Sequence, residues 1–129
     1  MTGHASFAIF PLRSLLLVTI EEEIADIEVT HLRDQLCQQV QRGRVHGVIV
    51  DMQRVEVLDS YMAHHLETMA AALRLLDATM VVAGLSVPVV MTLVDFGIEL
   101  VGLAFARDVE MAADMLEAGG GHEEISLPF

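Results

Sequence analysis

A carboxylate and a hydroxyl stand side by side where a loop is predicted to become a helix. Asp59 and Ser60 follow the short segment 55–58, and a helical repeat begins at Tyr61. Both residue types accept hydrogen bonds from the free backbone N–H groups of a helix start. The positive end of a helix dipole also tolerates a phosphate on the serine, which would add about −1.5 to −2 charges beside Asp59 and Glu56. The pair therefore predicts either a plain helix cap or a phosphorylation switch.

Enzyme chemistry is not expected from this chain. Its seven basic residues are all arginines, and without lysine both a lysine-bearing phosphate loop and Schiff-base catalysis are excluded. Asp51 ends an apolar strand, but the acidic pair and the later lysine that two-component receiver domains share are missing. Ser60 lies outside the nucleophile-elbow pattern. We expect no catalytic residue and no cofactor.

A metal site is not expected either. The adjacent His64 and His65 point in different directions, and the six histidines form no helical i, i+4 pair, so we expect surface histidines. Cys37 is the sole cysteine, which excludes an internal disulfide and suits the reducing cytosol. It lies beside the apolar face that Leu36 and Val40 share, where a small buried hydrophobe is expected rather than a nucleophile.

The charge of the chain restricts its partners. Nineteen acidic residues against seven basic ones give a net charge of −12, which disfavours nucleic acid and anionic lipid. It suits a protein partner with a basic docking face, or it serves only solubility. The uncharged stretch 78–94 is interrupted by Gly84 and Pro88, so we do not expect a membrane span. The first residues lack a secretory signal, and we expect a cytoplasmic protein.

Apolar periodicity predicts the elements that position Asp59 and Ser60. Strands are expected at 6–10, 14–20, 48–52, 80–83 and 101–105, and helices at 28–42, 61–76, 87–96 and from Asp108 to Glu117. The first two strands, joined by a turn at Pro11 to Arg13, are close enough for an antiparallel hairpin, and the later ones are separated by helices, which implies parallel pairing. The fold class is therefore α/β, a mixed sheet of about five strands with about four helices. Residues 1–118 form one domain, and 119–129 form a flexible tail.

The segment around Ser60 resembles STAS domains. An apolar strand ending in Asp51, followed by residues 55–63 (VEVLDSYMA), is most similar to the stressosome antagonists of the RsbS type, within the anti-sigma-factor antagonist superfamily. The runs 81–85 and 91–98 share this resemblance, which covers Phe7 to about Leu116. It implies a single STAS domain.

The resemblance also implies a mechanism. Such proteins assemble with longer STAS paralogues into homo- or hetero-oligomers that hold a GHKL-type serine/threonine switch kinase. Phosphorylation of the serine that corresponds to Ser60 releases the kinase, and a phosphatase resets the serine. Asp59, Ser60 and Tyr61 would then contact the kinase. Thr92 corresponds to a threonine that is modified in the longer paralogues and is a second candidate.

Two other functions remain open. The chain could be a free-standing anti-sigma-factor antagonist that binds one kinase in a small complex. It could also be a STAS domain that senses a small ligand, such as a nucleotide or lipid, at the same loop.

Overall fold

A five-stranded mixed sheet forms the middle layer of the computed structural model, which describes residues 6–122. The strands lie in the order β1 to β5; β1 and β2 are antiparallel, and each later strand is parallel to the one before it. The elements are β1 (Phe7–Leu12), β2 (Leu15–Ile20), α1 (Asp26–Arg42), β3 (Gly47–Asp51), α2 (Ser60–Leu75), β4 (Thr79–Ala83), α3 (Val87–Asp95), β5 (Ala104–Ala106) and α4 (Val109–His122). The predicted fold class is confirmed.

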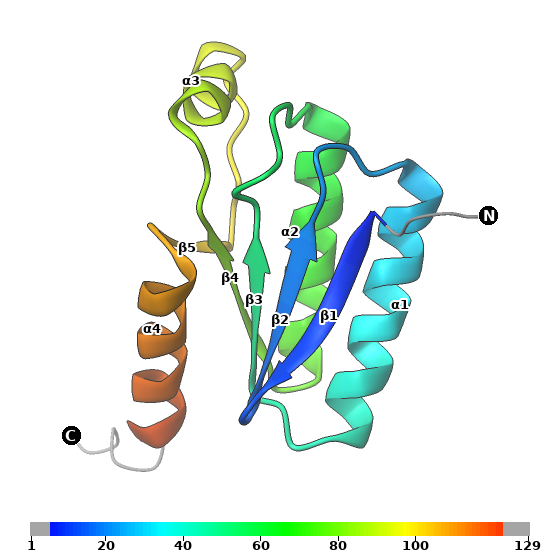
Figure 1. Ribbon diagram of the computed structural model, residues 1–129, viewed down its shortest axis with the longest axis vertical. Helices are drawn as coiled ribbons and strands as arrows, with labels where there is room; N and C mark the ends of the chain where they lie inside the picture. The colour runs from blue at the N-terminus through cyan, green and yellow to red at the C-terminus, as the bar shows by residue number, and fades with distance from the viewer. Residues whose placement is uncertain (1–5, 123–129) are drawn as a thin grey trace.

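Helices cover the two faces of the sheet unequally. In Figure 1, α1 and α2 lie on one face and α4 on the other, while α3 lies beyond the end of the sheet. The larger core is on the α1 and α2 side, where Val18, Val50 and Leu66 are fully buried. A smaller core joins α4 to the sheet around Ile49 and Leu116. Because β2 to β5 are parallel, their carboxyl ends share one edge of the sheet, the edge where sheets of this kind place their binding sites.

The first strand is longer than predicted because it continues through Pro11. The hairpin turn falls on Arg13 and Ser14, and Arg13 has a left-handed φ of 58°. The Glu21 N–H donates to the Ser6 carbonyl at 2.8 Å, so alternation along β1 turns the main-chain groups of Pro11 away from β2. Proline has no N–H to offer, and at this outward position of an edge strand no ladder bond is lost.

The fifth strand is shorter than predicted because α2 holds the residues before it. The Val101 N–H donates to Glu67 Oε2 at 2.8 Å, and Arg74 Nη2 donates to the Gly102 carbonyl at 3.0 Å. Gly102 has a φ of 79°, a conformation that favours glycine. These contacts bend the chain, so β5 begins only at Ala104.

The last helix is longer than predicted. Asp108 caps α4 as expected, because its Oδ1 accepts the Met111 N–H at 2.8 Å. The helix continues past Glu117 to His122, although glycine's weak helix propensity favoured an earlier end. The rest of the expected tail, 123–129, lies outside the described residues, and the domain boundary at residue 118 stays a prediction.

The uncharged stretch 78–94 divides between β4, a turn and α3. Across residues 6–122, no helix combines the length and the apolar character needed to cross a bilayer.

Two leucines on α2 give a matched test of which side of this helix faces the core. Leu66 is fully buried, whereas Leu75 is 87% exposed. Leu66→Ala is expected to lower the free energy of unfolding by about 2–5 kcal/mol because it leaves a cavity. Leu75→Ala should change it by less than about 0.5 kcal/mol. Urea denaturation followed by circular dichroism measures both, and similar losses would contradict this packing.

Candidate functional site

The loop between β3 and α2 is held by its own buried side chains. Met52, Val55 and Leu58 are each no more than 5% exposed. The Met52 N–H also donates to the Ala83 carbonyl, at 2.8 Å, which ties the start of the loop to β4. This fixed path brings residues 57–60 to the carboxyl ends of the parallel strands.

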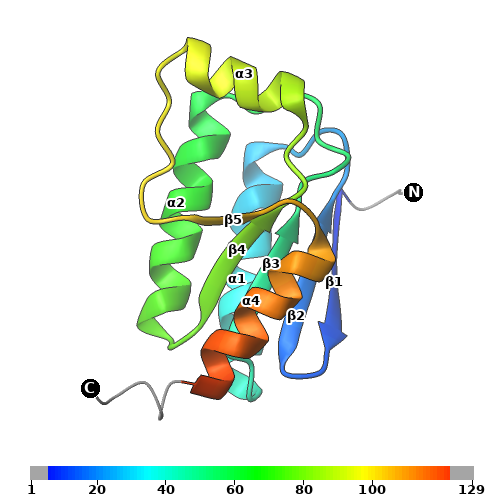
Figure 2. The ribbon, with the colours of Figure 1, turned by 90° about the vertical axis from the view of Figure 1, so that its left-hand side faces the viewer.

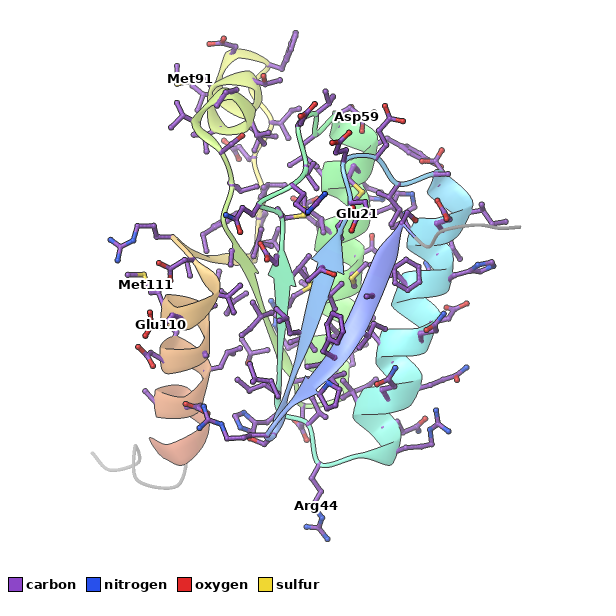
Figure 3. All side chains as sticks on the ribbon, in the orientation of Figure 1. Glu21, Arg44, Asp59, Met91, Glu110 and Met111 are labelled. Carbon is purple, nitrogen blue, oxygen red and sulfur yellow. The ribbon has the colours of Figure 1, made fainter. Side chains whose placement is uncertain are left out.

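Asp59, rather than Ser60, caps α2. Asp59 is extended, with φ −95° and ψ 176°, and its Oδ1 accepts the Met62 N–H at 2.8 Å. Ser60 is therefore the first helical residue; it is exposed, and its hydroxyl makes no hydrogen bond to another described residue. In Figure 3, Asp59 lies at the end of the molecule where α2 begins. The sequence allowed either residue to be the cap, and the structure leaves the serine hydroxyl accessible.

A groove joins this helix start to α3. It has a volume of about 460 Å³. Its lining residues are Val57, Leu58, Asp59, Ser60, Thr92, Phe96 and Ile98. Val57 and Phe96 are each 75% exposed, so the groove has an apolar rim. Ser60 and Thr92, the two predicted phosphoacceptors, are thus brought together on one surface.

The two hydroxyls of the groove differ in availability. Thr92 Oγ1 donates to the Pro88 carbonyl at 2.9 Å, and the residue is half-buried. Ser60 is exposed at a helix start. A hydroxyl that is already bonded within its own helix is the harder one for a kinase to reach, so the geometry favours Ser60 over Thr92.

Helix α3 presents apolar side chains to solvent. Only Val89 and Leu93 on it are buried. Val87, Met91 and Val94 are 72%, 51% and 66% exposed, and Figure 3 shows Met91 projecting outward from α3. A solvated helix normally has a polar outer face, so this surface is typical of a protein interface. This exposed face was not predicted from the sequence, although the lack of any charge in residues 87–94 indicates it.

Exposed acidic residues flank the groove, and its lining includes no basic side chain. Glu56, Asp59 and Asp95 are exposed, and none of the groove's lining residues is basic. Arg54, on the same loop, pairs with Glu21 at 3.3 Å. A phosphate on Ser60 would meet the N–H groups of the first helical turn but no arginine among the residues that line the groove.

Tyr61 extends the exposed surface of the site along α2. It is 53% exposed, and its ring packs edge-on against His65 with centroids 4.7 Å apart. The Nε2 atom of His65 is buried and has no hydrogen-bond partner among the described residues. His65 and His46 are both half-buried, contrary to the surface positions expected from the sequence.

The other candidate residues do not join this site. Cys37 is half-buried, and burial raises the pKa of its thiol; Arg33 opposes this rise and Asp34 adds to it. A raised pKa reduces the thiolate fraction, which agrees with a packing role. Within residues 6–122, no three histidine, cysteine or acidic side chains are grouped in a way that could hold a metal ion.

Comparison with known proteins agrees with the resemblance seen in the sequence. The family model described as the STAS domain matches residues 11–112. The RsbT co-antagonist protein RsbRA of Bacillus subtilis (strain 168) is 32% identical over 85 residues. That match covers 66% of this chain and 30% of RsbRA, so the chain corresponds to part of a longer relative.

Solved structures share the fold over nearly the whole described chain. A serine-to-glutamate variant of Moorella thermoacetica RsbS has a TM-score of 0.74 at 24% identity, covering 88% of this chain and 97% of that one. A chain in a solved structure described as the molecular architecture of the stressosome, a signal integration and transduction hub, has a TM-score of 0.73 at 26% identity. It covers 88% of this chain and 98% of that one.

Replacing the cap and its neighbour separates their structural roles. Asp59→Ala is expected to lower the free energy of unfolding by about 1 kcal/mol because the Met62 N–H loses its acceptor. Ser60→Ala should change it by less than about 0.5 kcal/mol, since the hydroxyl makes no contact that holds the fold. Thermal and urea unfolding measure both variants. A larger loss from Ser60→Ala would assign the cap to the serine instead.

Proposed function

The chain belongs to the STAS domain family, and we propose that it is a non-enzymatic scaffold and phospho-switch of a bacterial stressosome. In this role it sequesters a GHKL-type serine/threonine switch kinase and releases it when Ser60 is phosphorylated. One observation carries the proposal: an exposed serine hydroxyl stands at a capped helix start, beside a groove with an apolar rim.

The unmodified state offers the kinase a contact surface with an apolar rim. Val57, Tyr61 and Phe96 are all at least 53% exposed, and apolar and aromatic side chains of this kind dominate the energetics of interfaces. The acidic residues around them suit a partner whose docking face has a basic rim. Kinase binding would bury Ser60 together with this surface.

Phosphorylation then changes the charge of the contact surface. The phosphate adds about −1.5 to −2 charges next to Asp59, and no lining residue of the groove is basic. A charge that is buried without a partner costs several kcal/mol. The kinase would therefore dissociate because its interface has acquired an unpaired anion, without any need for α2 to unfold.

The other partners follow from the same role. We place the chain in the cytoplasm, in an oligomer with longer STAS paralogues, and we expect a phosphatase that resets Ser60. RsbRA, a relative that the chain matches over part of its length, is described as a co-antagonist of RsbT. A free-standing anti-sigma-factor antagonist is the alternative. Size-exclusion chromatography with a longer STAS paralogue distinguishes the two, because only the stressosome protein co-elutes with it in a large complex.

Ligand sensing at the same groove is less well supported. A nucleotide brings phosphates, and the residues that line the groove include an aspartate and no basic side chain. A thermal-shift screen against nucleotides tests this alternative, and a saturable shift that Ser60→Asp abolishes would favour it.

Charge at position 60 should control kinase binding. Ser60→Asp is expected to weaken binding at least about tenfold, or about 1.4 kcal/mol, because it brings an anion into the interface. Ser60→Ala should bind as the wild type does, since it removes only an exposed hydroxyl. Isothermal titration with the purified kinase measures both. If both variants bind like the wild type, the switch proposal is wrong.

The apolar rim should contribute to kinase binding before any phosphate is present. Val57→Glu and Phe96→Glu are each expected to weaken binding of the unphosphorylated protein at least about tenfold. Leu75→Glu is the matched control, because Leu75 is an exposed apolar residue at the far end of α2. If all three variants bind equally well, the kinase docks elsewhere.

Phosphopeptide mass spectrometry on the protein from stressed cells tests the modification itself. Because the chain has no lysine, trypsin should release Val55 to Arg74, which carries Ser60, and Leu75 to Arg107, which carries Thr92. We expect a stress-dependent phosphate on the first peptide, at Ser60. An unmodified Ser60 with good coverage of this peptide would contradict the switch proposal.

A further inference from the structure

Two charged side chains of α2 hold the segment that connects α3 to β5. The Val101 N–H donates to Glu67 Oε2 at 2.8 Å, and Arg74 Nη2 donates to the Gly102 carbonyl at 3.0 Å. Glu67 and Arg74 are about two helical turns apart, so they lie on one face of α2. Figure 2 shows the segment running down beside α2 before the chain enters β5. Two consecutive residues of the connection are thus bonded to one helix.

These bonds act where burial of side chains gives the segment little support. Val101 is 70% exposed, so its side chain does not hold it against the core. Leu100 and Leu103, on either side, pack against the core but are only partly buried. Gly102 has a φ of 79°, which favours glycine. The path of the chain at this point therefore depends on the two side chains of α2.

The same connection forms part of the groove beside Ser60. Phe96 and Ile98, which follow α3 directly, are lining residues of that groove. The Ile98 N–H donates to the Leu93 carbonyl at 2.9 Å, so these lining residues move together with the end of α3. Val101, which Glu67 holds, comes only three residues later. A shift of the connection would therefore displace one side of the groove.

Helix α3 has few other attachments that could prevent such a shift. Val89 and Leu93 are its buried residues. An apolar groove of about 410 Å³, lined by residues that include Val94 of α3 and Phe105 of β5, leaves space beside the helix. The end of α3 is therefore positioned largely through the connection that α2 holds.

We propose that Glu67 and Arg74, here called the α2 latch, set the affinity of the protein for its switch kinase by positioning the Phe96 side of the Ser60 groove. This inference rests on the proposed function, because the kinase is the partner that would dock on the groove. Neither residue of the latch lines the groove. They are positioning residues that act through the connection between α3 and β5.

Loss of the latch should weaken docking and leave the phosphorylation step unchanged. When only a fraction of the molecules has the docking conformation, the apparent dissociation constant rises by the inverse of that fraction. Ser60 and its neighbouring cap, Asp59, belong to the start of α2, which the latch does not hold. The kinase concentration that gives half-maximal phosphorylation should therefore rise, while the rate at saturating kinase stays the same.

Glu67→Ala and Glu67→Gln are the matched pair that tests the latch. Both variants lose the charge, but glutamine keeps a side-chain oxygen that can accept the Val101 N–H. In isothermal titration with the purified kinase, Glu67→Ala should raise the dissociation constant at least about fivefold, and Glu67→Gln should stay within about twofold of the wild type. Asp114→Ala, which removes an exposed acid from α4, controls for net charge. Single-turnover phosphorylation of Ser60 at saturating kinase should proceed at the same rate in all of them.

Hydrogen exchange of the free protein tests the positioning without the kinase. Glu67→Ala should speed exchange in peptides that cover 92–103 and leave those that cover 57–63 unchanged, and Glu67→Gln should restore the slow exchange. Arg74→Met, which keeps the length of the side chain but removes the donor, should act in the same direction as Glu67→Ala. Alanine, glutamine and methionine all suit a helix, so α2 should form in each variant, which circular dichroism checks.

The outcomes separate this inference from the proposed function. If the wild type binds the kinase and Glu67→Ala binds equally well, the inference is wrong and the proposed function stands. The same holds if Glu67→Gln loses as much affinity as Glu67→Ala, because the lost charge then explains the effect, or if exchange over 92–103 does not change. A wild type that fails to bind the kinase would overturn the proposed function and this inference with it.

Discussion

The burial of three apolar side chains in the loop after β3 is the constraint on which the site depends. Met52, Val55 and Leu58 cannot leave the core without exposing their surface to water, so the loop has one path. That path delivers Asp59 to α2 in the extended conformation that a cap requires. Ser60 then becomes the first helical residue, with its hydroxyl in solvent. Hydrophobic packing thus positions a polar site, and the hydrogen bond from the Met62 N–H to Asp59 then fixes the start of the helix.

The α3 side of the groove is held to the core by few buried side chains. Val89 and Leu93 are the buried residues of α3, and grooves lie on both of its flanks. One groove contains Ser60 and Thr92, and the other lies beside the open edge of β5. The helix therefore stands between the surface proposed for the kinase and a second, apolar groove that Leu85, Phe105 and Ala106 also line. Both use apolar area that the fold leaves uncovered at the end of the sheet.

Apolar periodicity was enough to predict the class of the fold and the order of its elements. It failed where a contact distant in sequence sets a boundary. Val101 has a side chain typical of strands, but its N–H donates to Glu67 of α2 instead of to a neighbouring strand. Pro11 is typical of turns, but the hairpin register places it in β1 with its main-chain nitrogen facing away from β2. Asp59 and Ser60 were identified as the helix start, yet which of them caps it depends on the path of the loop. The groove that brings Thr92 and Phe96 to Ser60 could not be predicted, since it depends on where α3 lies.

The charges around Ser60 determine which kind of switch this site can be. Many phosphorylation switches order a segment by giving the phosphate an arginine to bind. Here the groove has no basic lining residue, and Arg54 of the same loop is paired with Glu21. The cap that Asp59 makes is worth about 1 kcal/mol, whereas an unpaired charge buried in an interface costs several. A phosphate on Ser60 would therefore weaken the binding of a partner much more than it would lower the folding stability of the free protein. The phosphate proposed at Ser60 would therefore act by expelling a partner from the groove, because the serine is exposed at the rim where that partner would dock.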